Sequence, residues 1–173
     1  MTASDAGSAV LAPADYRIDP ATTTITFTTK HMFGLGSVKG SLAVSDGHVA
    51  VAERTEDSSV EVTLDVASFA TDNPKRDDKV RSATLLDAAS HPTMSYRAGA
   101  AERRGSSWVL HGQLTVRGTT APVDLVVRDV VATPEGLTAT ATGRVDRTLV
   151  GVTAMKGMVG RYLDVSIEVT ATA

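Results

Sequence analysis

The sequence predicts an all-β fold, an eight-stranded antiparallel up-and-down barrel with one short helix. Apolar and polar residues alternate in eight separate runs, which is the pattern of strands with one buried face. Short polar turns join these runs, so consecutive strands are expected to pair antiparallel. The runs of about 10–12 residues exceed the usual ~5–6. A closed barrel removes the exposed edges that a sandwich, the other common solution, would leave on such long strands.

The first three strands are read from alternation that begins near residue 23. Ile25 and Phe27 alternate with threonines, so one face of this run is apolar. The second run, residues 38–44, carries valine and leucine on one side and is expected to stop at the turn pair Asp46-Gly47. The third run, residues 58–66, alternates valine and leucine with glutamate, threonine and aspartate. Each run therefore predicts an amphipathic strand.

The helix is expected where the alternation stops, between residues 71 and 89. Asp72 or Asn73 can cap a helix there, and Pro74 is tolerated in its first turn. The charged residues 76–81 that follow are interpreted as a solvent-exposed helix face with weak ion pairs, not as a catalytic cluster.

The remaining five strands follow the helix with the same period of two. Their apolar faces are Met94 and Tyr96, then residues 108–116, 123–127, 137–145 and 163–169. No internal repeat or linker interrupts them. We therefore expect one domain, residues 15–173, after a flexible N-terminal tail, residues 1–14.

Composition and charge exclude several classes of function. Lysine and arginine number 17 and aspartate and glutamate 20, which gives a net charge of −3 and argues against a nucleic-acid partner. The absence of cysteine excludes disulfides, thiolate nucleophiles and cysteine metal sites. The four histidines show no metal-binding spacing, and no nucleophile or phosphate-loop motif is present. We predict no enzyme activity, no catalytic residues, no metal site and no cofactor.

The N-terminal residues and the hydropathy of the chain indicate where in the cell the protein is expected. No apolar run approaches the ~20 residues of a membrane helix, so no integral membrane segment is expected. Residues 1–14 lack the basic and apolar segments of a secretion signal. We expect a cytoplasmic protein, and a periplasmic or secreted one if the chain has been trimmed.

The inward faces of the predicted barrel carry few large side chains. The chain has one tryptophan, three tyrosines and three phenylalanines, and Ala139, Ala141 and Gly143 follow one another on one face. An eight-stranded barrel is either filled by side chains or holds one small ligand. Because an empty apolar cavity costs about 24 cal/mol per Å³, a long apolar ligand is favoured. The alternative is a solid-core β-domain that acts as an interaction or stress-response protein.

The candidate ligand-binding residues are those expected to face the interior or its mouth. They are Phe27, His31, Val38, Leu42, Val62, Leu64, Leu85, Leu86, Met94, Tyr96, Leu114, Val116, Leu125, Ala139, Ala141, Arg147, Met155, Met158, Val165 and Ile167.

Two of these residues are candidates for the polar end of a ligand. His31 shares the parity of the inward positions Ile25 and Phe27, and Arg147 that of Val145, so both are expected near the barrel mouth. The alternatives are a histidine bonded to a backbone carbonyl and an arginine in a surface ion pair. Adaptable methionines, Met155 and Met158, form either a flap over the opening or ordinary packing.

Several short segments, in their order and spacing along the chain, carry a family likeness. They are Tyr16–Pro20, Lys30–Met32, Arg76–Asp77 with Val80–Ser82, Leu85–Ala88 before His91–Pro92, and Gly112–Thr120 with Pro122. Together they resemble the YceI-like family from about Tyr16 to the C-terminus. The chain departs from the family pattern at Thr148–Val150, where an acidic residue and an aromatic often precede the glycine.

The resemblance implies a lipocalin-like barrel with the helix near its opening and a bound polyisoprenoid, such as the tail of a quinone. It also implies a homodimer. We therefore predict non-catalytic binding, storage or transport of a long-chain isoprenoid lipid, a polyprenyl quinone or polyisoprenoid, in the barrel interior.

Overall fold

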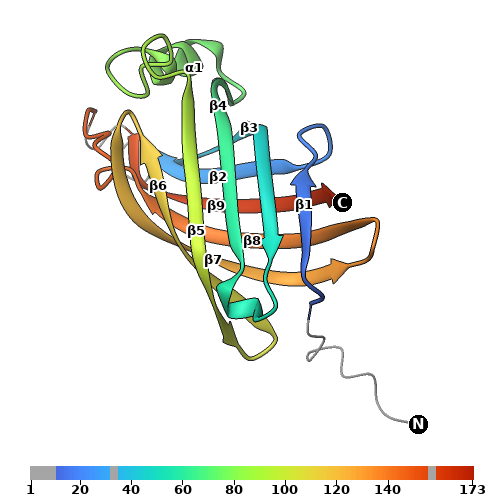
Figure 1. Ribbon diagram of the computed structural model, residues 1–173. Helices are drawn as coiled ribbons and strands as arrows, with labels where there is room; N and C mark the ends of the chain where they lie inside the picture. The colour runs from blue at the N-terminus through green and yellow to red at the C-terminus, as the bar shows by residue number, and fades with distance from the viewer. Residues whose placement is uncertain (1–10, 32–34, 156–158) are drawn as a thin grey trace.

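The computed structural model describes residues 11–31, 35–155 and 159–173, without the side chain of His31. It is a closed barrel of eight antiparallel strands with one short helix (Figure 1). The barrel strands are β2 (Thr24–His31), β3 (Gly36–Val51), β4 (Ser59–Ala70), β5 (Thr93–Arg104), β6 (Ser107–Val116), β7 (Thr119–Ala132), β8 (Gly136–Asp146) and β9 (Val159–Thr172). Their order is β3-β2-β9-β8-β7-β6-β5-β4, and pairing of β3 with β4 closes the ring. The predicted fold is confirmed.

A short strand outside the ring, β1 (Ala14–Ile18), is missing from the sequence-based prediction. It pairs antiparallel with the end of β3 and, at Arg17 and Ile18, with the end of β9. Tyr16 and Ile18 are buried, whereas the residues that alternate with them are exposed. Five residues are too few to reveal this alternation in the sequence. The connection between β3 and β4 contains a single 3₁₀ turn, η1 (Thr55–Asp57).

The prediction that Asp46-Gly47 ends the second strand is wrong, because β3 continues through both residues to Val51. The pairing of β3 with β4 shifts register between Val44 and Asp46, which marks a bulge. A Cβ atom on Gly47 would lie 2.7 Å from Cδ1 of Ile18. The glycine therefore allows β1 to approach β3 closely, and it makes no turn.

Helix α1 (Pro74–Arg81) follows β4, and Asn73 is its N-cap. The Asn73 side-chain oxygen accepts hydrogen bonds from the backbone amides of Lys75 and Arg76 at 3.1 and 3.2 Å. Pro74 occupies the first turn, where its missing N–H leaves no internal bond unmade. Of the two predicted caps, the structure selects Asn73.

The interpretation of residues 76–81 as a solvent-exposed face is wrong in part. Asp77 is buried and accepts hydrogen bonds from the backbone amide and the hydroxyl of Thr71. Arg81 donates from Nε and Nη2 to the carbonyl oxygen of Phe69. These two side chains fasten α1 to the end of β4. Only the pairs with the exposed carboxylates of Asp72 and Asp78 match the prediction.

The barrel has two distinct ends. The connections β2–β3, β4–β5 with α1, β6–β7 and β8–β9 lie together at one end, here called the helix end (Figure 1). Arg117 in the β6–β7 turn donates to the carbonyl of Leu85 at 2.7 Å, which joins that turn to the segment after α1. The opposite end holds β1, η1 and the β5–β6 and β7–β8 turns. Within the described ranges, no helix has the length and apolar character needed to cross a membrane.

Candidate functional site

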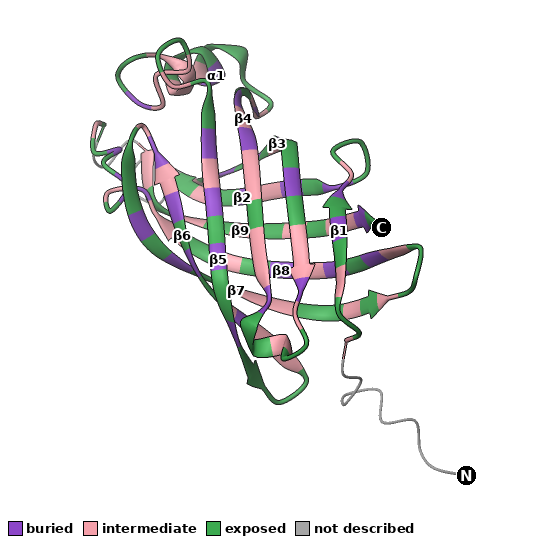
Figure 2. Ribbon diagram, viewed as in Figure 1, coloured by how far each residue is buried: buried purple, intermediate pink, exposed green. Residues whose placement is uncertain are grey.

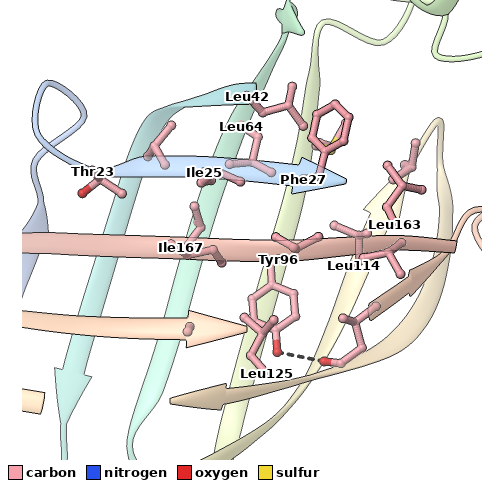
Figure 3. A pocket seen from close by; sticks show the side chains of 18 of the residues that line it. Thr23, Ile25, Phe27, Leu42, Leu64, Tyr96, Leu114, Leu125, Leu163 and Ile167 are labelled. Carbon is pink, nitrogen blue, oxygen red and sulfur yellow. Dashed lines mark hydrogen bonds between the residues drawn. The ribbon is translucent and has the colours of Figure 1, made fainter. Parts of the chain in front are cut away.

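The barrel encloses an apolar cavity of about 640 Å³, and every barrel strand contributes side chains to its wall (Figure 3). The cavity extends from Lys79 and Met155 at the helix end to Leu11 and Trp108 at the opposite end. Its volume lies within the ~300–1,000 Å³ of pockets that bind small molecules. The interior of the described barrel is therefore hollow, and the solid-core alternative is wrong.

The period-two pattern determines which side chains reach this cavity. Buried and more exposed residues alternate along the strands, for example over the first half of β5 (Figure 2). The inward positions of β8 include Ala139 and Ala141, both buried, each of which contributes a single methyl group to the wall. Small residues here, opposite the larger side chains of β4 and β5, leave the interior unfilled.

Tyr96 brings a polar group into the apolar interior. Its hydroxyl donates a 2.8 Å hydrogen bond to the carbonyl oxygen of Val123 (Figure 3). Burial, with a smaller contribution from the negative charge of Asp124, raises the pKa of Tyr96 well above its ordinary value of 10.0, so the phenol stays protonated. A Cβ on Gly112 would lie 2.2 Å from the hydroxyl oxygen, so the glycine makes room for the ring.

The structure brings nearly all the predicted ligand-binding residues together on the cavity wall. Those that line it are Phe27, Val38, Leu42, Val62, Leu64, Leu85, Leu86, Met94, Tyr96, Leu114, Val116, Leu125, Ala139, Ala141, Arg147, Met155, Val165 and Ile167. Whether each contacts a ligand stays a prediction.

The two other predicted residues lie outside what the structure describes. His31 is the last residue of β2, and its side chain is not described, so its place at the ligand's polar end stays a prediction. Met158 lies in the undescribed range 156–158. Met155 lines the cavity and is partly exposed at its helix end.

Further wall residues are absent from the predicted ligand-binding set. Trp108 and Leu110 lie on the predicted apolar face of residues 108–116, and like Leu114 they line the cavity from β6. Arg76 and Lys79 also line the cavity, from α1. No periodic signal identifies them, because their position depends on how the helix lies across the barrel end.

Arg147 organises the connection between β8 and β9. Only 6% of the residue is exposed, and its guanidinium donates to four backbone carbonyls. Nε bonds Gly160 at 2.9 Å, Nη1 bonds Val152 and Ala154 at 2.8 Å each, and Nη2 bonds Val159 at 3.1 Å. Burial lowers its pKa, but a guanidinium remains charged in proteins. The alternative of a surface ion pair is wrong.

Comparison with known proteins agrees with this geometry. A family model described as the YceI-like domain matches residues 16–171. The protein YceI of Escherichia coli is 32% identical over 123 residues, which cover 69% of this chain and 63% of that protein. The chain thus spans about three-fifths of the length of the curated relatives it matches.

Two solved structures share the fold at low sequence identity. BcnA of Burkholderia cenocepacia superposes with a TM-score of 0.78 at 20% identity, over 90% of this chain and 99% of that chain. A polyisoprenoid binding domain from Saccharophagus degradans superposes with a TM-score of 0.66 at 11% identity, over 91% and 98%. With a family model that matches almost the whole barrel, the chain belongs to the YceI-like family.

Proposed function

We propose that this protein binds a long-chain isoprenoid lipid in the barrel cavity and stores or transports it without chemical change. The observation that carries the proposal is the 640 Å³ cavity, whose wall is built from valine, leucine, isoleucine, alanine and other apolar side chains of all eight strands. Membership of the YceI-like family and the fold shared with a polyisoprenoid binding domain support the same ligand class.

The energetics favour a ligand that is apolar over most of its length. Burial of one CH₂ group contributes roughly 0.8 kcal/mol, so each five-carbon isoprene unit contributes about 4 kcal/mol before ordering costs. A tail of several units can therefore bind tightly through its hydrocarbon alone. The strands that form the wall are hydrogen-bonded to their neighbours around the whole barrel. A wall that is ordered before the ligand arrives loses less conformational entropy on binding.

The chemistry of the wall supports binding over catalysis. Among the residues that the structure describes, the wall contains no aspartate, glutamate or histidine to act as a general acid or base. The Tyr96 hydroxyl is committed to the carbonyl of Val123, and four N–H groups of Arg147 are committed to backbone carbonyls.

Organic extraction of the purified protein followed by mass spectrometry tests the proposal. We expect a co-purified isoprenoid, or uptake of added polyprenyl quinone with a stoichiometry near one per barrel. The heat-unfolded protein is the control for non-specific adsorption. Recovery of no lipid together with no uptake would contradict the proposal.

A homodimer and a cytoplasmic location are further proposals that stay predictions. Light scattering after size-exclusion chromatography at two concentrations tests the first, and fractionation of the source cells tests the second.

A further inference from the structure

The cavity wall carries charge of only one sign. Three cationic side chains, Arg76, Lys79 and Arg147, line it, and no carboxylate does among the described residues. All three lie at the helix end, two on α1 and one where β8 ends. At the opposite end the polar wall residues, such as Thr55 and Ser58, are uncharged. The cavity is therefore electrostatically asymmetric along its length.

The three cations differ in how many of their N–H groups lack a hydrogen-bond acceptor among the described residues. Arg147 is occupied by four carbonyls, so it adds positive charge to this end but holds the β8–β9 connection rather than a ligand. Arg76 donates from Nε to the hydroxyl of Thr71 and from Nη2 to Asp72, and within the described chain no acceptor bonds its Nη1. Among the described residues, the Lys79 ammonium has a single long contact, 3.4 Å to the hydroxyl of Thr84.

The acidic residues near α1 face away from the cavity. The carboxylate of Asp72 is 93% exposed and that of Asp78 is 80% exposed, where it pairs with Arg81. Asp77 is buried against the backbone amide and hydroxyl of Thr71. Of the charged side chains on α1, only those of Arg76 and Lys79 line the cavity wall in the described structure.

Cations at the end of an apolar cavity match a ligand of opposite charge. An arginine guanidinium binds phosphate or carboxylate oxygens through paired N–H groups, and a lysine ammonium adds a mobile point charge. The side chain of Arg76 is only 28% exposed, so the low polarity of the adjoining wall strengthens such a pair with Arg76 relative to water. A neutral quinone carbonyl accepts hydrogen bonds from these groups, but it carries no charge to pair with them.

We propose that the helix end of the cavity binds an oxyanion head group through Arg76 and Lys79, with the apolar tail extending toward Trp108. This inference rests on the proposed lipid-binding function and specifies its ligand as an anionic amphiphile. The chemistry is shared by prenyl phosphates and long-chain carboxylates.

Matched ligand pairs separate the head group from the tail. Geranylgeranyl phosphate is compared with geranylgeraniol, and palmitate with hexadecanol, each below its critical micelle concentration. Trp108, the only tryptophan in the chain, lines the tail end of the cavity, so its fluorescence reports occupancy. We expect at least one anion to bind about 10-fold or more tightly than its alcohol, with a preference that weakens as salt is raised. The pair that shows the preference identifies phosphate or carboxylate.

Substitutions on α1 assign the preference to the two cations. The R76Q/K79Q double variant is expected to bind the anion and its alcohol with nearly equal affinity. K79Q alone leaves the Arg76 bonds to Thr71 and Asp72 in place. This variant should lose part of the preference for the anion over its alcohol. K75Q is the control, because Lys75 is exposed on the same helix and does not line the cavity.

The outcomes distinguish this inference from the function on which it rests. Equal binding of anion and alcohol in both pairs, or a preference that survives R76Q/K79Q in a folded protein, overturns the oxyanion site and leaves lipid binding intact. Failure of all four ligands to bind would instead count against the proposed function itself.

Discussion

The hydroxyl of Tyr96 lies 2.8 Å from the carbonyl oxygen of Val123, so a side chain of β5 reaches past β6 to the backbone of β7. The strand it crosses has a glycine, Gly112, at the crossing point. This contact fixes the orientation of the Tyr96 ring against the cavity wall, and it satisfies a polar group that burial would otherwise leave unpaired.

Gly112→Ala should destabilise the fold by about 1–3 kcal/mol, because the new methyl group overpacks a filled site and displaces the tyrosine. The methyl carbon would lie 2.2 Å from the Tyr96 hydroxyl oxygen. Urea unfolding followed by circular dichroism measures the loss. Gly99→Ala is the matched control, since no heavy atom of a described residue beyond its chain neighbours lies within 4 Å of its added carbon. Equal stability of the two variants would contradict the role assigned to Gly112.

Ala141→Trp should obstruct the cavity and lower lipid uptake at least about 10-fold while the barrel still folds. Ala141 is buried and lines the wall in the middle of β8. The control is Thr142→Trp, whose side chain lies exposed on the outer face of the same strand. Uptake of polyprenyl quinone is measured by mass spectrometry. Unchanged uptake by a folded Ala141→Trp variant would show that the tail lies elsewhere.

Arg147→Met should lower the free energy of unfolding by about 2–4 kcal/mol, because four backbone carbonyls lose their donor. We also expect faster hydrogen exchange at the described amides of the β8–β9 connection, such as that of Val152, which bonds the Arg147 carbonyl. Arg144→Met is the control. Arg144 forms an exposed ion pair with Asp164, so its loss should change stability much less. A small effect of Arg147→Met would contradict its organising role.

Asp77 should make the protein sensitive to acid. Burial would raise its pKa, but the hydrogen bonds from Thr71 and the charges of Arg81 and Arg76 outweigh burial and lower it below the ordinary 3.8. A carboxyl whose pKa is lowered by folding stabilises the protein above its unfolded pKa. This stabilisation is lost as the pH falls from about 3.8 through the folded value.

Asp77→Asn should therefore be less stable than the parent by about 1–2 kcal/mol at pH 7, since the amide replaces one acceptor oxygen with a donor. The difference should shrink as the pH is lowered below 4, where the parent carboxyl is also protonated. Urea unfolding at a series of pH values measures both effects. Asp78→Asn, at an exposed carboxylate, is the control. A difference that stays constant with pH would contradict the assignment.

The strands of the barrel and most of its cavity wall follow from local pattern. The alternation of apolar and polar neighbours in the sequence shows that residues such as Leu42, Leu114 and Ile167 share the apolar face of their strands. Closure of the sheet brings these apolar faces together around one interior. Small residues at Ala139 and Ala141 likewise indicate unfilled space before any contact is known.

Features that depend on distant contacts could not be predicted in this way. Asp46-Gly47 has the composition of a turn, but Gly47 is needed because the side chain of Ile18 packs against it, and Ile18 lies far away in sequence. Arg147 has inward parity, yet its carbonyl partners belong to an irregular connection without periodicity. The burial of Asp77 depends on how α1 docks on the end of β4, which the charges of the helix do not reveal.

Strand β1 has a practical consequence for redesign of the chain. Ile18 pairs with Ala171 and Arg17 with Thr172, so the first and last described strands are neighbours (Figure 1). A linker of a few residues from Ala173 back to Ala14 would therefore join adjacent segments. A circular permutant opened at the exposed β5–β6 turn, at Gly105, should keep every strand pairing and carry its new termini at the end of the barrel away from α1.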